Sequence, residues 1–379
     1  MSIIIFVVVL IVLIFVHELG HFSIAKLFGV RVDEFGLGFP PKIFSKKYGE
    51  TVYSLNWIPF GGFVKIFGED PDAESLTGSD SSRSLVNKPK WIQTLVLIAG
   101  VSFNILFAWL LISLGFMSGL PASVNSYPTA HFNDAKVVIT SVLPGSPAAK
   151  ANLKTGDAIV SMSKLCNLGD VQTTCDVRDS VFGSNTFKAS DVQDFIAQSD
   201  NQPITIKISE GQTTKEIVVT PIIGVVEGKA ALGIGLDTIG ALRLPIHQAF
   251  YQGAILTYDL TKTTAIGLVS FFKNIFIGRA DLKQVTGPVG IIGLVGDAAH
   301  LGFIYLLSFT AFISINLAVI NLLPFPALDG GRILFIIIEA IKRSPIKPKV
   351  ANTLNTIGFA LLILLMLVIT FHDVFKMFW

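Results

Sequence analysis

Charged residues are scarce in this chain. They make up 15% of its 379 residues, whereas hydrophobic residues make up 51%. Soluble domains typically carry about 25% charged residues, so the composition excludes an ordinary soluble protein and indicates a membrane protein. The formal net charge of +2 is too small to suggest nucleic acid as a partner. The length allows roughly two or three structural units.

Lysine and arginine are absent from the first 25 residues. The opening segment therefore lacks the basic start of a signal peptide, and it shows no small-residue cleavage site, so we interpret it as a retained transmembrane helix. The chain also lacks internal repeats and a helix with several polar residues along one face, which argues against a transporter. Cysteine occurs only at Cys166 and Cys175. The eight residues between them allow a disulfide loop in an oxidising compartment, and two free thiols are the alternative.

Four apolar runs are long enough to cross a membrane, which takes about 20 residues of helix. They cover residues 3–28, 91–120, 303–323 and 354–371. The stretch 247–277 is weaker because it holds Asp259, Lys262 and Lys273. It is predicted to form one or two amphipathic helices at a membrane surface, and a fifth span is the competing interpretation.

The first apolar run contains the motif His17-Glu18-Leu19-Gly20-His21. On a helix, this spacing places both imidazoles on one face about one turn apart, where they can bind one Zn²⁺ beside a glutamate acting as general base. Residues 3–16 carry no charge. Ionisable residues at membrane depth are costly unless a partner compensates them, and a metal ion is such a partner. The alternative is a helix end that carries polar residues at the interface.

The distribution of basic residues predicts the topology. Lysine and arginine number eight in residues 29–90 and four in residues 342–349, so the positive-inside rule places both segments in the cytosol. The N-terminus and residues 121–302 then lie outside. His17 comes roughly 21 Å into the first helix, in the cytosolic half of the bilayer. The third span runs inward from the outside, so Asp329 at its end reaches a similar depth.

Asp329 is the candidate third metal ligand, because a catalytic zinc site typically has three protein ligands and a water. It lies where prolines and glycines interrupt the helix, in the segment NLLPFPALDGG at 321–331. Irregular backbone at membrane depth is tolerated where it is buried in protein or lines a watery cavity. The alternative is a plain Asp-Gly turn. Asn321 is predicted either to hydrogen-bond the substrate backbone or a developing oxyanion, or only to satisfy the broken helix end.

These motifs occur in a specific order: HELGH at 17–21, Gly100 and Asn104 in AGVSFN, a PDZ-like segment, and NLLPFPALDGG at 321–331. Over nearly its whole length the chain resembles the site-2 protease family of intramembrane zinc metalloproteases, the bacterial RseP type. The resemblance implies that His17, His21 and Asp329 bind Zn²⁺, that Glu18 activates water, and that Asn321 engages the substrate.

The implied enzyme is a zinc metalloendopeptidase that hydrolyses peptide bonds within transmembrane segments of single-span membrane proteins. Anti-sigma factors and remnant signal peptides are the substrates that the resemblance suggests, in regulated intramembrane proteolysis. One departure is that many Gram-negative members carry tandem PDZ domains, whereas this chain has room for one. A membrane scaffold that binds partners through the PDZ-like domain, with a vestigial metal site, is the alternative function.

Two β-rich segments are predicted between the spans. Residues 137–149 resemble a strand, a turn and a short helix of a PDZ-like domain, and 204–208 and 216–219 alternate like strands. PDZ folds bind extended peptides at a sheet edge, and the alternative is a small domain that only blocks access. Residues 51–67 alternate around Pro59 and Gly61-Gly62, which predicts a hairpin. In the resembled family such an element helps to hold the substrate; the alternative is a purely structural hairpin.

The predicted fold class is a polytopic α-helical membrane protein with about four transmembrane helices, an inserted PDZ-like α+β domain and a cytosolic-side, membrane-associated β-hairpin. We expect a multi-pass protein of the bacterial inner (plasma) membrane, a monomer in contact with lipid, with an extracytoplasmic N-terminus and an active site near the cytosolic side. The predicted segments are helix 1 with HExxH (1–28), the cytosolic loop with the hairpin (29–90), helix 2 (91–120), the extracytoplasmic PDZ-like domain (121–240), the amphipathic segment (241–302), helix 3 with the LDG motif (303–340), and a cytosolic loop with helix 4 (341–379).

Overall fold

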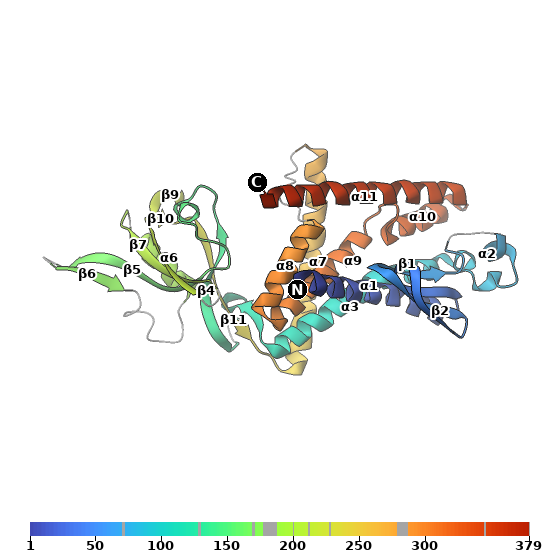
Figure 1. Cartoon of the computed structure of the whole chain (residues 1–379), viewed down its shortest axis with the longest axis horizontal. Helices are drawn as coiled ribbons and strands as arrows, with labels where there is room; N and C mark the ends of the chain where they lie inside the picture. Colours follow the sequence, from blue (N-terminus) through green and yellow to red (C-terminus); the bar gives the residue numbers. More distant parts are fainter. Residues whose placement is uncertain are drawn as a thin grey trace. The chain divides into compact units, whose positions relative to one another are not determined.

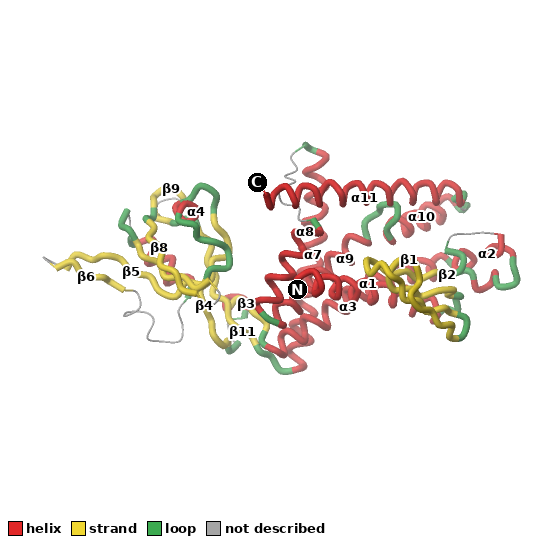
Figure 2. The backbone as a smooth tube through the Cα atoms, viewed as in Figure 1, coloured by secondary structure: helices red, strands yellow, loops and turns green. Residues whose placement is uncertain are grey.

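The fold is described from a computed structural model, which divides into two compact units. The first unit comprises Met1–Gly115 and Ile246–Trp379, and the second comprises Phe116–Pro245. Figure 1 labels their elements, and Figure 2 shows that helices dominate the first unit and strands the second. The structure describes residues 1–69, 73–127, 130–168, 171–176, 188–199, 201–210, 213–226, 229–278, 287–344 and 346–378.

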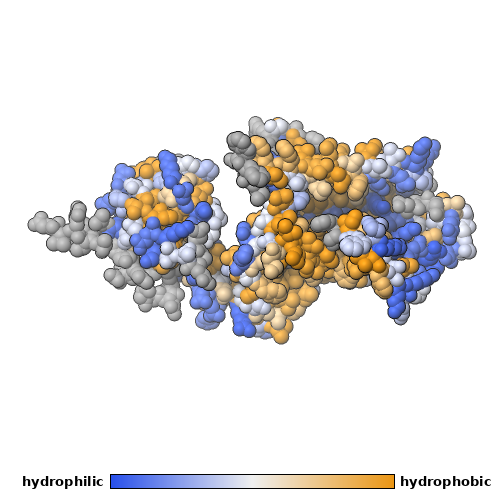
Figure 3. All heavy atoms as spheres, viewed as in Figure 1, coloured by the Kyte–Doolittle hydropathy of each residue, from blue (hydrophilic) through white to orange (hydrophobic). Residues whose placement is uncertain are grey.

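Four of the described helices are long and apolar enough to cross a membrane. They are α1 (Ser2–Leu27), α3 (Lys90–Ser118), α9 (Phe303–Asn321) and α11 (Pro348–Phe378), which confirms the predicted number of spans. Helix α7 (Ile246–Phe276) is one continuous helix that does not meet the same criterion. In Figure 3, hydrophobic side chains cover much of the helical unit, and hydrophilic ones gather near the β1–β2 turn.

Helices α1 and α3 cross at close range because one contact residue is a glycine. A Cβ atom at Gly20 would lie 2.4 Å from the carbonyl oxygen of Ala99. Small residues at such crossings allow two membrane helices to bring their backbones together. The crossing therefore places the motif of α1 directly against the middle of α3.

A long β-ribbon follows α1 and is built from β1 (Val32–Tyr48) and β2 (Thr51–Ile66). The chain turns at Gly49 and Glu50, and residues 42–48 pair with 51–56. Residues 34–37 pair with 52–55 on one side and with 62–65 on the other. The buried core here joins α1, the ribbon and α3 through Ala25, Val30, Val32, Phe35, Val64, Ile66, Leu85, Ile92 and Val96.

This pairing corrects one prediction. The two halves of residues 51–66 do not pair with each other, so the hairpin turn expected around Pro59 and Gly61-Gly62 is wrong. Instead, both halves pair with the first half of β1, which lies between them. The alternation of apolar residues indicates strands but not their partners, because a side-chain period of two is the same for every pairing.

A cluster of charged residues holds the turn of the ribbon to the end of α1 and to the connection before α3. Arg83 donates two hydrogen bonds to the carboxylate of Glu50, at 2.7 and 2.8 Å, and Lys26 donates a third at 2.5 Å. Arg83 belongs to a connection that contains α2 (Ala73–Thr77) and the short 3₁₀ helices Ser81–Arg83 and Leu85–Asn87. This connection returns the chain to the start of α3.

The last third of the chain is interrupted between α9 and α10 (Asp329–Lys342). Helix α8 (Pro288–Leu301) precedes α9 and is separated from it by Gly302. Between α9 and α10 the chain forms a compact loop, in which Leu328 donates its backbone hydrogen bond to Phe325 at 3.1 Å. Asn355 of α11 accepts a hydrogen bond from the backbone of Ala327 at 3.3 Å. The interruption thus stands where the prolines predict it, and Asp329 begins the next helix.

The second unit is a sheet domain. Its sheet has the strand order β3-β11-β4-β5-β7-β8, and β6 pairs with β5. The strands are β3 (Leu120–Ser123), β4 (Phe132–Val142), β5 (Ala158–Leu168), β6 (Val171–Asp176), β7 (Ile204–Glu210), β8 (Thr213–Val219) and β11 (Ile234–Leu242), with β9 (Ile222–Val226) and β10 (Lys229–Ala231) in a separate pair. The described part of this unit also contains the helices α4 (Pro147–Lys150) and α6 (Ala189–Ala197) and the 3₁₀ turn Val124–Ser126.

The strands predicted at 204–208 and 216–219 lie in β7 and β8, and the segment 137–149 contains a strand and a short helix as expected. The core gathers buried aliphatic side chains of the sheet, among them Val137, Ile139, Ile204 and Ile206. Assignment of this sheet domain as PDZ-like stays a prediction. The side chains of Cys166 and Cys175 lie outside the described part of the structure. The predicted alternatives of a disulfide or two free thiols therefore both stay predictions.

Candidate metal centre

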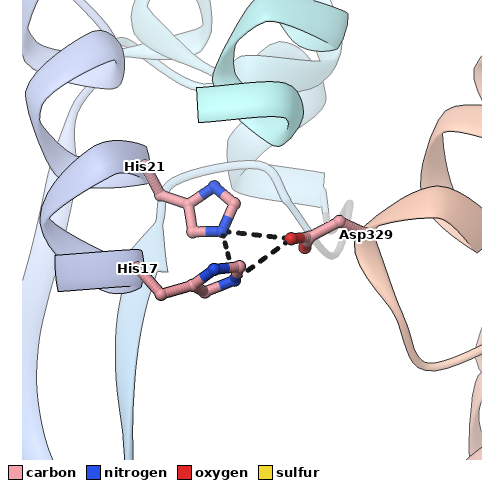
Figure 4. A group of neighbouring side chains, drawn as sticks. All are labelled: His17, His21 and Asp329. Carbon is pink, nitrogen blue, oxygen red and sulfur yellow. Dashed lines mark hydrogen bonds and ion pairs between the residues drawn. The ribbon is translucent and has the colours of Figure 1, made fainter. Parts of the chain in front are cut away.

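Three of the predicted site residues converge in the helical unit. His17 and His21 point from the same face of α1 toward Asp329, the first residue of α10 (Figure 4). The Nε2 atoms of the two histidines lie 3.2 Å apart, and an Asp329 carboxylate oxygen lies 3.1 Å from His17 Nε2 and 3.4 Å from His21 Nε2. Both histidines are buried. Residues separated by more than 300 positions therefore form one compact group.

The second ring nitrogen of each histidine is also held. His21 Nδ1 donates to the backbone carbonyl of Val96 on α3 at 2.8 Å, which leaves the lone pair on Nε2. His17 Nδ1 lies 3.2 Å from the amide nitrogen of Asn104, while the amide oxygen of Asn104 is buried without a hydrogen-bond partner. Flipping the Asn104 side-chain amide by 180° would exchange its oxygen and nitrogen. His17 Nδ1 could then donate to the amide oxygen, and both of these atoms would have a hydrogen-bond partner. Both imidazoles would then direct an unprotonated Nε2 at Asp329.

This donor set fits a zinc ion. Two imidazole lone pairs and a carboxylate oxygen converge, and that oxygen, Asp329 Oδ2, is buried with no hydrogen-bond donor. A cation bound between these three acceptors would satisfy all of them at once. Tetrahedral ligands at the usual bond lengths of about 2.0–2.1 Å lie about 3.3 Å apart, which agrees with the observed 3.1, 3.2 and 3.4 Å. The two histidines and the aspartate fit zinc in both chemistry and spacing.

Gly100 provides the space for this arrangement. A Cβ atom at Gly100 would lie 2.3 Å from His21 Nε2 and 2.8 Å from His17 Cε1. Any larger residue here would occupy the space of the imidazoles. The glycine in AGVSFN is therefore explained by close approach of α3 to the two histidines.

A cavity of about 560 Å³ opens beside these ligands. Glu18 lines it together with the ligand candidates, Asn321 of α9 and residues 61–64 of β2. The amide nitrogen of Asn321 lies 3.5 Å from His17 Nε2. A Cβ atom at Gly62 would be 3.4 Å from Glu18 Cγ, so β2 runs alongside the glutamate. All five predicted site residues thus border one space large enough for a peptide segment.

Two further residues of the cavity escaped the sequence analysis. Glu69 follows β2, Arg332 lies one turn after Asp329, and their side chains form an ion pair across the cavity. The only signal in the sequence is that Arg332 directly follows the Gly330-Gly331 pair. Its partner could not be found, because the two residues are 263 positions apart.

Comparison with known proteins gives a consistent result. Residues 5–365 match Peptidase family M50. A Clostridium perfringens protein named as a zinc metalloprotease is 37% identical over 364 residues, which cover 96% of this chain and 95% of that protein. The zinc metalloprotease RasP of Geobacillus kaustophilus is 29% identical over 100% of this chain and 98% of its own length. The regulator of sigma-W protease RasP of Bacillus subtilis is 28% identical over 100% and 99%.

Proposed function

The chain belongs to peptidase family M50 and is a zinc metalloprotease, and from this premise we propose that it hydrolyses peptide bonds within transmembrane segments of single-span membrane proteins. The observation that carries the proposal is the position of the ligand candidates. His17 and His21 lie on α1, which is apolar and long enough to cross a membrane, and Asp329 begins α10, which follows α9, another such helix. The three residues meet beside a cavity that Glu18 also lines. A protease site in this setting is suited to a substrate that also lies in the membrane.

His17, His21 and Asp329 would hold the zinc ion. When bound, Zn²⁺ supplies Lewis acidity and an ionisable water. Glu18 takes the proton of the water that attacks the peptide carbonyl and returns it to the leaving amine. Asn321 donates a hydrogen bond to the substrate backbone or to the developing oxyanion, which its position near His17 Nε2 supports.

The edge of β2 is suited to hold the substrate. A helical substrate hides its backbone amides in its own hydrogen bonds, so it must be extended before water can attack. Residues 62–65 pair with β1 on one side, and in the described part of the chain they have no strand partner on the other. Residues 62–64 of this edge border the cavity. An extended substrate segment would add along this edge by backbone hydrogen bonds, next to Glu18.

The proposal includes the location of the protein in the cell and its orientation in the membrane. We place this multi-pass protein in the bacterial inner membrane, as a monomer. We orient it with the N-terminus outside and the site toward the cytosol, because the basic residues concentrate in 29–90 and 342–349. The Bacillus subtilis relative is named regulator of sigma-W protease, which favours anti-sigma factors as substrates here. The sheet domain would act outside the membrane as a PDZ-like filter for substrates.

The test compares wild type with Glu18→Gln in detergent or liposomes, using a single-span model substrate. We expect both proteins to retain zinc and the variant to lose cleavage by about 100-fold to 10,000-fold, since a neutral side-chain amide cannot take the proton from water. Glu74→Gln is the matched control, because Glu74 lies in α2 and is 67% exposed, and it should cleave like wild type. Unchanged cleavage by Glu18→Gln, or a wild type that holds no zinc, would favour the scaffold with a vestigial metal site instead.

A further inference from the structure

Helix α10 has two distinct sides. One side lines a cavity of about 120 Å³ that α3 and α11 complete; its residues are Arg332, Phe335, Ile336 and Glu339. The other side is exposed and apolar, with Leu334, Ile337, Ile338 and Ile341. Asp329 is the first residue of this helix. The position of the third ligand candidate therefore depends on how α10 is held.

Two ion pairs hold the inner side of α10. Arg332 pairs with Glu69, and Glu339 pairs with Lys90 at the start of α3. Positions seven apart lie on the same helix face, about two turns from each other. Arg332 and Glu69 are 29% and 24% exposed, so solvent screens this pair only in part. Glu69 is itself fixed to the end of β2, since its backbone N–H donates to Ile66 at 3.1 Å.

The two ion pairs differ in how far Asp329 can move when α10 tilts around each of them. Glu339 lies ten residues from Asp329, or about 15 Å along the helix, and Arg332 lies about 4.5 Å away. A tilt of about 4° around Glu339 moves Asp329 by about 1 Å, whereas the same tilt around Arg332 moves it by about 0.3 Å. Metal–ligand distances hold to about 0.2 Å. Of the two ion pairs, the one near Asp329 therefore restrains the carboxylate more closely.

We propose that Glu69 and Arg332 are a positioning pair, which holds Asp329 within coordination distance of His17 and His21 and ties it to the end of strand β2. The inference rests on the proposed ligand set. It adds a function for two residues to which the proposed mechanism gives no role. The pair also links the metal site to the substrate-binding strand, because Glu69 follows β2 and Arg332 lies in α10. It would therefore fix the distance between the metal and that strand.

The sign of the effect on zinc affinity separates positioning from simple electrostatics. If the pair acted only through its charges, Arg332→Gln would remove a positive charge near a cation and strengthen zinc binding, and Glu69→Gln would weaken it. If the pair positions Asp329, both substitutions weaken zinc binding. The exchanged pair Glu69→Arg with Arg332→Glu then restores it, because the link is remade with the charges reversed.

The experiment measures the zinc dissociation constant of the full-length protein in detergent by competition with a chelator. We expect Arg332→Gln and Glu69→Gln each to weaken zinc binding about 10-fold to 100-fold, as for residues that orient metal ligands. The exchanged pair should return to within about twofold of wild type. Lys90→Gln, which breaks the equivalent pair at the far end of α10, is the matched control and should also stay within about twofold. The melting temperature of each variant is recorded.

Tighter zinc binding by Arg332→Gln, or equal loss by Lys90→Gln, would overturn the inference. So would wild-type zinc affinity in both single variants. If Arg332→Gln fails to fold, Glu69→Gln and the exchanged pair give the same decision. Failure here is distinct from failure of the proposed function: a wild type that cleaves the model substrate while all variants hold zinc equally well overturns only the positioning pair.

Discussion

Replacing Gly100 by alanine tests the packing of the metal centre with a single methyl group. The added Cβ would lie 2.3 Å from His21 Nε2, whereas ordinary contacts begin at 3.4 Å. The imidazole would have to move by about 1 Å, far more than the tolerance of about 0.2 Å in a metal–ligand distance. A displacement of about 1 Å in a catalytic group can cost about 100-fold in rate. We expect Gly100→Ala to lose bound zinc and at least about 100-fold in cleavage.

The assay measures zinc content, cleavage and melting temperature on the same preparation. Alanine stabilises a helix by about 1 kcal/mol relative to glycine, so helix α3 should persist and the loss should be specific to the site. Gly293→Ala in α8 is the matched control, because its Cβ would have no neighbour within 4 Å; it should keep zinc and cleavage. The reasoning is refuted if Gly100→Ala binds zinc and cleaves like wild type, since the imidazoles would then not occupy the space beside α3.

Two further predictions concern residues around the site and at the ribbon turn. Asn104→Leu removes the acceptor for His17 Nδ1 and should weaken zinc binding about 10-fold to 100-fold, whereas Asn104→Asp keeps an acceptor and should retain zinc; equal affinity in the leucine variant and wild type would contradict this role. The guanidinium of Arg83 and the ammonium of Lys26 lower the pKa of Glu50 from 4.5 to about 2. Its contribution to stability is therefore present above pH 4.5 and is lost as the pH falls toward 2; because Glu50 is about one-third exposed, we expect at most about 1 kcal/mol. Melting temperatures of wild type and Glu50→Gln should differ at pH 7, and the difference should shrink as the pH falls below 4.5 and disappear near pH 2; a constant difference would be inconsistent with this linkage.

The membrane spans could be predicted because their signal is local. An apolar run of sufficient length must form a helix in a bilayer, since no water is available for its backbone groups. The interruption after α9 follows from Pro324 and Pro326, which cannot continue a helix. The spacing of His17 and His21 is likewise a property of one helix. For these features the sequence contains all the necessary information.

The pairing of the ribbon strands could not be predicted from local sequence patterns. The alternation of residues 51–66 predicts strands, but their partners depend on bends in β1 and β2 that alternation does not encode. The pair of Glu69 and Arg332 is a stronger case, because an ion pair between residues 263 positions apart has no period or motif. Asn104 was marked only through the family resemblance, and its contact with His17 required the crossing of α1 and α3.

The sequence by itself determined the class of protein, the spans and the residue types able to hold zinc, because burial in a bilayer and helical spacing act over a few turns. The tertiary structure decided that His17, His21 and Asp329 lie within 3.4 Å of one another. It also decided that Gly100 leaves room for them and that Glu69 reaches Arg332. Those distances depend on how separate helices and strands cross. Side-chain packing between the elements determines these crossings, and it is complete only when the whole chain is folded.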